Sequence, residues 1–178
     1  FRADVPPLLT TLADRVRLLG RYGMAEVIAY PVTEAVMGMH WEDFLRELLD
    51  RGAVGFVCGD DFRFGSRGAG NARKLKEFCL ARKLPCIIVP EQTLEGARIS
   101  SSYIRRQIET GDMATAVRFL GHPHILRGTV VHGRALGRTL GVPTANLRLV
   151  PGMAVPRYGV YACRCVIGDA VYKAVTNI

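Results

Sequence analysis

Residues 133–146, with the sequence GRALGRTLGVPTAN, combine the residue types that bind phosphate. Glycine recurs every four residues at Gly133, Gly137 and Gly141, and an arginine follows each of the first two, Arg134 and Arg138. Glycine lets backbone N–H groups approach a phosphate closely, and a guanidinium group adds positive charge. We therefore expect Gly133, Arg138 and Gly141 to contact the phosphates of a nucleotide.

The end of the same segment carries two candidate metal ligands. Thr144 and Asn146 project to the same side if the chain is extended after Pro143. A hydroxyl and a carboxamide oxygen are hard ligands, which suits a Mg²⁺ ion that is shared with phosphate. The alternative is an ordinary loop in which Thr144 and Asn146 cap turns. The chain has no GxxxxGK[ST] sequence, which excludes a Walker-type site.

A second cluster lies in residues 59–71, GDDFRFGSRGAGN. Asp60 and Asp61 supply hydrogen-bond acceptors, and Phe62 and Phe64 supply ring faces. A flat polar heterocycle such as isoalloxazine or adenine requires this combination. The alternative is an Asx-type turn with two buried aromatic rings.

A third cluster opens a predicted helix. Ser100, Ser101 and Ser102 stand where the free N–H groups of a helix favour an anion, and Arg105 lies one turn further on. This arrangement could stabilise a phosphate during transfer. The alternative is N-capping by Ser100 with Arg105 in solvent.

The distribution of charge indicates what kind of partner the protein binds, and the cysteines indicate its compartment. Residues 1–97 carry 13 Lys and Arg against 13 Asp and Glu, whereas residues 98–178 carry 11 against three, so the whole net charge of +8 lies in the second part. Ten of those 11 cations are arginine, which favours a polyanionic partner, either nucleic acid or a phosphorylated small molecule. Five cysteines without a CxxC pair indicate reduced thiols in a cytosolic protein.

Helix-like and strand-like patterns of apolar residues alternate along the first 120 residues and predict the elements that position the second and third clusters. Thr11 and Asp14 form a capping-box pattern ahead of a helix that begins at residue 12 and has Leu12, Val16 and Leu19 on one face. Further helices are expected over 41–49, over about 72–83 and over 100–110, with a short one between Asp112 and Gly121. Strands are expected over 26–30, 54–58 and 86–89. This order indicates a parallel α/β domain with helices on both faces of the sheet. Ligands of such domains bind outside the carboxyl ends of the strands, where residues 59–71 begin.

The pattern changes after His124. Residues 125–131, 159–167 and 170–175 read as strands, with a turn at Gly168–Asp169, and no helical pattern follows Leu120. We expect the start of a small antiparallel barrel, with a domain boundary near 121–123 that separates residues 1–121 from 122–178. His122, His124 and His132 span this boundary, which favours surface or hydrogen-bonded histidines over a metal site.

The motifs resemble a known family. GRTLGVPTAN, followed by GVYA at residues 159–162, closely resembles the riboflavin kinase domain. GDDFRFGSRGAGN and RISSSYIRRQI (residues 98–108) resemble the FMN adenylyltransferase part of bacterial bifunctional riboflavin kinase/FAD synthetases. The resemblance implies a Rossmann-like nucleotidyltransferase domain followed by an antiparallel β-barrel kinase domain.

The resemblance also implies roles. Thr144 and Asn146 would hold Mg²⁺ and the phosphates of ATP while riboflavin is phosphorylated to FMN. Ser101, Ser102 and Arg105 would hold phosphates, and Asp61 and Phe62 would line the flavin pocket, while FMN is adenylylated to FAD. The implied partners are riboflavin, FMN, FAD and ATP in the cytoplasm, with no nucleic acid and no membrane. The rival hypothesis is a basic nucleic-acid-binding barrel, against which the few aromatic residues after His124 count.

Two family features are missing from these 178 residues. An HxGH motif would lie before Phe1, and a glutamate that acts as general base would lie after Ile178. We therefore expect a fragment of a longer chain, with neither active site complete. Val142 also stands where the family usually has Phe.

Overall fold

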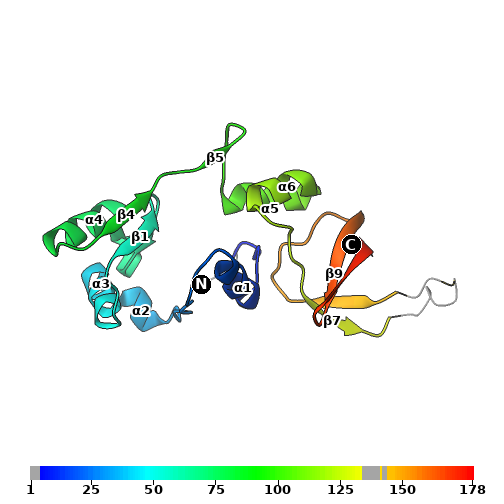
Figure 1. The fold of residues 1–178 in the computed structure, drawn as a ribbon, viewed down its shortest axis with the longest axis horizontal. Coiled ribbons are helices and arrows are strands. Elements are labelled where there is room, and N and C mark those ends of the chain that lie inside the picture. Colours follow the sequence, from blue (N-terminus) through cyan, green and yellow to red (C-terminus); the bar gives the residue numbers. More distant parts are fainter. Residues whose placement is uncertain (1–4, 134–140, 142–143) are drawn as a thin grey trace. The chain divides into compact units, whose positions relative to one another are not determined.

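The computed structural model describes residues 5–133, 141 and 144–178 (Figure 1). The chain divides into two compact units, one formed by Phe1–Val27 with Ile99–Ile178 and the other by Ile28–Arg98. The first unit is therefore discontinuous in sequence. It combines residues from both sides of the predicted boundary at 121–123.

The Ile28–Arg98 unit is built around a parallel pair of strands (Figure 1). Strand β1 (Phe56–Gly59) pairs with β4 (Cys86–Val89), with Phe56 opposite Cys86 and Gly59 opposite Val89. Helices α3 (Trp41–Asp50) and α4 (Ala72–Ala81) contribute to one apolar core, formed by Leu45, Phe64, Leu75, Phe78 and Cys79. The prediction of a parallel α/β domain is confirmed.

Smaller elements complete this unit. They are α2 (Glu34–Gly38), the hairpin of β2 (Arg63–Phe64) and β3 (Gly70–Asn71) with a 3-10 turn at Ser66–Gly68 between them, and the hairpin of β5 (Thr93–Leu94) and β6 (Ala97–Arg98). The sequence patterns did not predict these elements.

Within Ile28–Arg98 the described helices pack on the face that bears Phe56, Cys58 and Cys86, and Val57 and Ile87 on the other face are 67% and 60% exposed. One expectation was wrong. The run Glu26–Tyr30 forms no strand. A strand needs a neighbour for its backbone hydrogen bonds, whereas Tyr30 packs its ring edge-on against Phe44 of α3, with the centroids 5.8 Å apart.

The discontinuous unit begins with α1 (Leu12–Arg21), which Thr11 caps by accepting a hydrogen bond from the Asp14 N–H, as predicted. The apolar face was predicted wrongly. Leu12 and Val16 are exposed, and Asp14 and Leu18 are the buried residues of the helix. The helix is turned this way because the Asp14 carboxylate pairs with Arg127.

Helices α5 (Ser101–Thr110) and α6 (Met113–Leu120) pack against each other, with the rings of Tyr103 and Phe119 4.6 Å apart. Asp112 caps α6, and Gly121 ends it in the left-handed conformation. These boundaries agree with the predicted ones.

Only strands follow in the described part of the chain, as expected. Strand β7 (Gly128–Val131) pairs antiparallel with β8 (Asn146–Leu149), and β9 (Val160–Ile167) pairs antiparallel with β10 (Ala170–Asn177). Gly168, with φ of 58°, turns the chain between β9 and β10. The described residues form two separate ribbons and no closed barrel.

Candidate functional site

Asp60 and Asp61 lie where β1 ends, at the carboxyl edge of the parallel strands. The Asp60 N–H donates to the Val89 carbonyl (3.1 Å), and the Asp60 carboxylate accepts from the N–H of Glu91 (3.3 Å). Asp61 accepts from an Nη of Arg98 (2.7 Å), and the Nε of the same arginine lies 3.0 Å from Glu91. Arg98 thus holds two carboxylates at this edge and fixes the position of Asp61.

Phe62 presents an aromatic surface beside this ion-pair network. Its ring stacks on Phe64, with the centroids 5.3 Å apart and the planes 21° apart. Phe64 is buried in the core, whereas Phe62 is 40% exposed. The chain therefore supports a ring with one face on the core and leaves part of it open, as a platform for a flat heterocycle requires.

Two glycines let this loop fold tightly onto the core. At Gly65, with φ of 71°, a Cβ would lie 2.5 Å from the Cα of Trp41. At Gly70 a Cβ would lie 2.6 Å from the ring of Phe64. Any other residue at either position would push the loop away from the core and displace the Phe62 platform.

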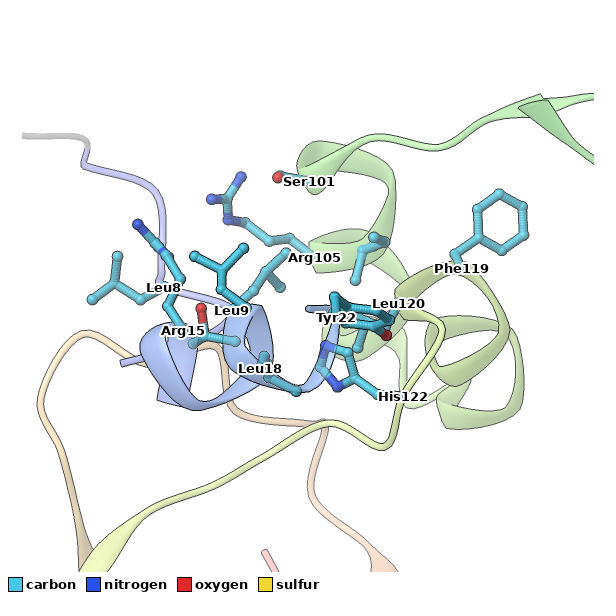
Figure 2. Close-up of a pocket in the computed structure, with 13 residues that line it drawn as sticks. Leu8, Leu9, Arg15, Leu18, Tyr22, Ser101, Arg105, Phe119, Leu120 and His122 are labelled. Atoms are coloured by element: carbon cyan, nitrogen blue, oxygen red, sulfur yellow. The ribbon is translucent and has the colours of Figure 1, made fainter. Parts of the chain in front are cut away.

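The serine–arginine cluster lies at the start of α5. Ser100 caps the helix by accepting from the Tyr103 N–H (3.2 Å). Ser101 and Arg105 line a cavity of about 400 Å³ together with apolar residues of α1, α5 and α6, and Figure 2 shows these two side chains at the same end of it. The Nε of Arg105 donates to the Pro7 carbonyl (2.6 Å), so Arg105 is not simply in solvent. Ser102 is exposed and is not one of the residues that line the cavity.

Gly133, the first glycine of the segment 133–146, lies next to Asn146 at the end of the β7–β8 ribbon. Asn146 lies opposite Val131 in the last residue pair. At Gly133 a Cβ would lie 2.2 Å from the amide nitrogen of Asn146, so a larger residue at this position would displace the Asn146 side chain. Thr144 and Asn146 are both exposed. Arg138 lies outside the described residues, and Gly141 adopts a φ of 74°, which favours glycine.

The donor set fits a hard cation better than a soft one. In the part of the chain that the structure describes, no three His, Cys, Asp or Glu side chains gather into a metal site. The Thr144 hydroxyl and the Asn146 carboxamide are both exposed, and Asn146 lies beside Gly133. Oxygen ligands of this kind suit a Mg²⁺ ion that retains several waters.

Of the three histidines near the predicted boundary, His122 and His124 lie within hydrogen-bond distance of backbone carbonyl groups and His132 is exposed. His122 Nδ1 lies 2.8 Å from the carbonyl oxygen of Pro123, and His124 Nε2 lies 2.8 Å from that of Ala154. Burial lowers the pKa of His124, so it is neutral near pH 7 and its Nε2 donates to Ala154.

No helix among the described residues is long and apolar enough to cross a membrane.

Sequence reasoning missed two ion pairs, Asp61–Arg98 and Asp14–Arg127. Their partners are 37 and 113 residues apart. The only signal for the second was that Asp14 occupies the third position after the cap, where an acidic residue already has a local explanation.

Comparison with known proteins divides the chain in sequence order. The family model described as FAD synthetase matches residues 1–103, and the one described as riboflavin kinase matches residues 120–178. A bifunctional riboflavin kinase/FMN adenylyltransferase of Bacillus subtilis is 33% identical over 172 residues, which are 96% of this chain and 54% of that protein. The protein of the same name from Escherichia coli K12 is 33% identical over 182 residues, which cover all of this chain and 58% of that protein. The chain spans about half the length of these relatives.

A solved structure is also similar. It is described as a macrolide-efflux protein from Streptococcus pneumoniae, and it superimposes with a TM-score of 0.84 at 34% identity over 95% of this chain and 55% of that one. The likeness shows that this chain shares its fold.

Proposed function

Since the chain belongs to the FAD synthetase family, with a riboflavin kinase part after the synthetase part, we propose that the protein in which it lies makes flavin cofactors. Riboflavin is phosphorylated by ATP to FMN, and FMN is adenylylated by a second ATP to FAD. The observation that carries the proposal is that both family models match in order, the first over residues 59–71 and the serines that open α5 and the second over residues 133–146. The names of the curated relatives support the same two activities.

In the phosphorylation, the terminal ribityl hydroxyl of riboflavin attacks the γ-phosphorus of ATP, and ADP leaves. Thr144 and Asn146 would bind Mg²⁺, which neutralises charge on the phosphates when it is bound. Gly133 leaves room for the Asn146 amide, and Gly141 and Arg138 would contact the phosphates. Such transfers depend on positioning and charge neutralisation, which this segment's residue types can supply.

In the adenylylation, a phosphate oxygen of FMN attacks the α-phosphorus of ATP, and pyrophosphate leaves. Ser101 and Arg105 would bind phosphate oxygens at the cavity that they line, with Ser102 beside them at the start of α5. Phe62 would stack on the flavin ring, and Asp61, held by Arg98, would accept a hydrogen bond from it. We further propose a cytoplasmic protein, which its five free cysteines support. We also propose that it has no nucleic-acid or membrane partners.

The test of the kinase assignment is riboflavin phosphorylation by the full-length protein that carries Thr144→Ala or Asn146→Ala. Both variants should lower the rate by about 100-fold or more, because a ligand of the phosphate-binding metal is lost. Thr129→Ala and Asn177→Ala are matched controls, since both residues are exposed strand residues away from the loop, and they should keep full activity. Undiminished FMN formation in both loop variants would exclude the assignment.

Gly133→Ala gives a steric test of the same site. The added Cβ would displace the Asn146 amide, so KM for Mg·ATP should rise about tenfold or more. Gly20→Ala is the control, because the position beside Gly20 is open and alanine suits a helix. Equal KM values for the two variants would contradict the placement of Asn146 in the site.

A further inference from the structure

Asp14 is a buried charge whose partner, Arg127, lies 113 residues further along the chain. It is 1% exposed on the first turn of α1. Its carboxylate accepts from the Thr11 hydroxyl (2.6 Å), from the Nε of Arg127 (3.3 Å) and from an Nη of Arg127. The side chain of Arg127 is half-exposed. Because a buried carboxylate is costly without a partner, this pairing fixes Arg127 relative to α1.

Arg127 in turn lies at one end of the β7–β8 ribbon, where Gly128 pairs with Leu149. We call this end the base of the ribbon. It directly precedes Gly128, the first residue of β7, and its carbonyl accepts a hydrogen bond from the Val150 N–H (3.0 Å), which directly follows β8. Four residue pairs lead from there to the other end of the ribbon, where Asn146 faces Val131. A rigid ribbon fixed at Arg127 therefore also fixes Asn146.

The chain beyond β8 is anchored to the same segment. Leu8, which precedes α1, donates its N–H to the Gly152 carbonyl (2.7 Å) and accepts from the Ala154 N–H (2.8 Å). Both ends of the ribbon's base thus contact residues of the FAD synthetase part, one through Arg127 and one through the Leu8 bridge.

We propose that Asp14 and Arg127 are positioning residues for the kinase reaction, because they hold the base of the β7–β8 ribbon that presents Asn146. The inference rests on the proposed function for its kinetic consequence. Neither residue is a ligand of ATP or of Mg²⁺ in the proposed site. They act through the ribbon, and through it the FAD synthetase part supports the kinase part.

The structural test is amide hydrogen exchange in the full-length protein and its Asp14→Asn and Arg127→Lys variants. Arg127→Lys keeps a positive charge near Asp14, so it folds even if Asp14→Asn does not. Exchange in β7 and β8 should become about tenfold faster or more, while exchange in α5, which belongs to the same unit, stays nearly constant. The control Arg46→Gln, which breaks an exposed pair with Glu42 and Asp43, should change neither.

Equal acceleration in α5 and in the ribbon would show a general loss of stability and would overturn the proposal. Unchanged exchange in the ribbon would also overturn it.

The kinetic test separates positioning from stability. In both variants KM for Mg·ATP should rise about tenfold, while KM for riboflavin stays within about twofold, because only the end that bears Asn146 is displaced. A parallel rise in both constants would overturn the positioning role. If the unmodified protein does not phosphorylate riboflavin, the proposed function fails, and the exchange experiment still decides whether the pair anchors the ribbon.

Discussion

Phe62 is the residue on which the flavin assignment depends most directly, because its ring stacks on Phe64 and is partly exposed to solvent. Phe62→Ala should raise KM for FMN in the adenylylation by about tenfold, since stacking on an aromatic ring contributes on the order of 1–3 kcal/mol. The thermal midpoint should change little, because Phe62 is 40% exposed. Steady-state kinetics at saturating ATP measures the effect.

Tyr158→Ala is the matched control for this substitution, since Tyr158 is 90% exposed and belongs to the other unit. It should leave KM for FMN unchanged. Phe62→Tyr should restore binding, because a tyrosine ring can stack in the same place. An unchanged KM in Phe62→Ala would remove Phe62 from the flavin site.

Residue types predicted the candidate clusters, but their partners were not predictable. The ring pair of Phe62 and Phe64 is local, and both its residue types and its place after a strand were evident from the sequence. The ion pair between Asp61 and Arg98 joins two of the recognised motifs over 37 residues, and no periodicity indicates it. Local chemistry is encoded in neighbouring residues, whereas pairing between clusters depends on the fold.

At the scale of elements, the caps were the most predictable feature. Thr11, Asp112 and Gly121 begin or end helices where the sequence placed them, because each cap satisfies backbone groups within three or four residues. The buried face of α1 was not predictable, since Arg127, 113 residues away, decides which side turns inward. The prediction of a strand over 26–30 was wrong for a related reason. A strand needs a neighbouring strand for its backbone hydrogen bonds, and residue types alone do not indicate whether one is present.

The cap of α4 gives a stability prediction. Asn71 accepts a hydrogen bond from the Lys74 N–H (2.9 Å) through its Oδ1. Asn71→Ala should lower the free energy of unfolding by about 1 kcal/mol, while Asn71→Asp should retain the cap. Denaturant unfolding followed by the fluorescence of Trp41, which packs against the same core, measures the difference. Equal losses in both variants would show that the cap contributes nothing.

At the scale of the whole molecule, the Asp14–Arg127 pair predicts a dependence of stability on pH. The hydrogen bonds from Arg127 hold the pKa of Asp14 below its ordinary value, against the opposing effect of burial, and Arg17 adds a smaller effect in the same direction. A carboxyl group with a lowered pKa stabilises the folded state above its unfolded pKa of about 3.9. That contribution is lost as the pH falls through the folded pKa.

The measurement is the unfolding midpoint of the unmodified protein and of Asp14→Asn between pH 7 and pH 2.5. The variant should be less stable at pH 7, and the gap should narrow once the pH falls below about 4. A gap that stays constant over this range would show that the Asp14 charge does not contribute.

The discontinuity of the first unit also bears on how the chain is made. A ribosome releases α1 before Ile28–Arg98, and only after both the residues that complete the unit of α1. Arg127 follows Asp14 by 113 residues, which at 5–20 residues per second is a delay of roughly 6–23 seconds. During that interval the carboxylate of Asp14 and the side chain of Leu18 lack their folded surroundings. Until Arg127 has been synthesised, the nascent α1 therefore lacks the residues that bury it in the folded protein.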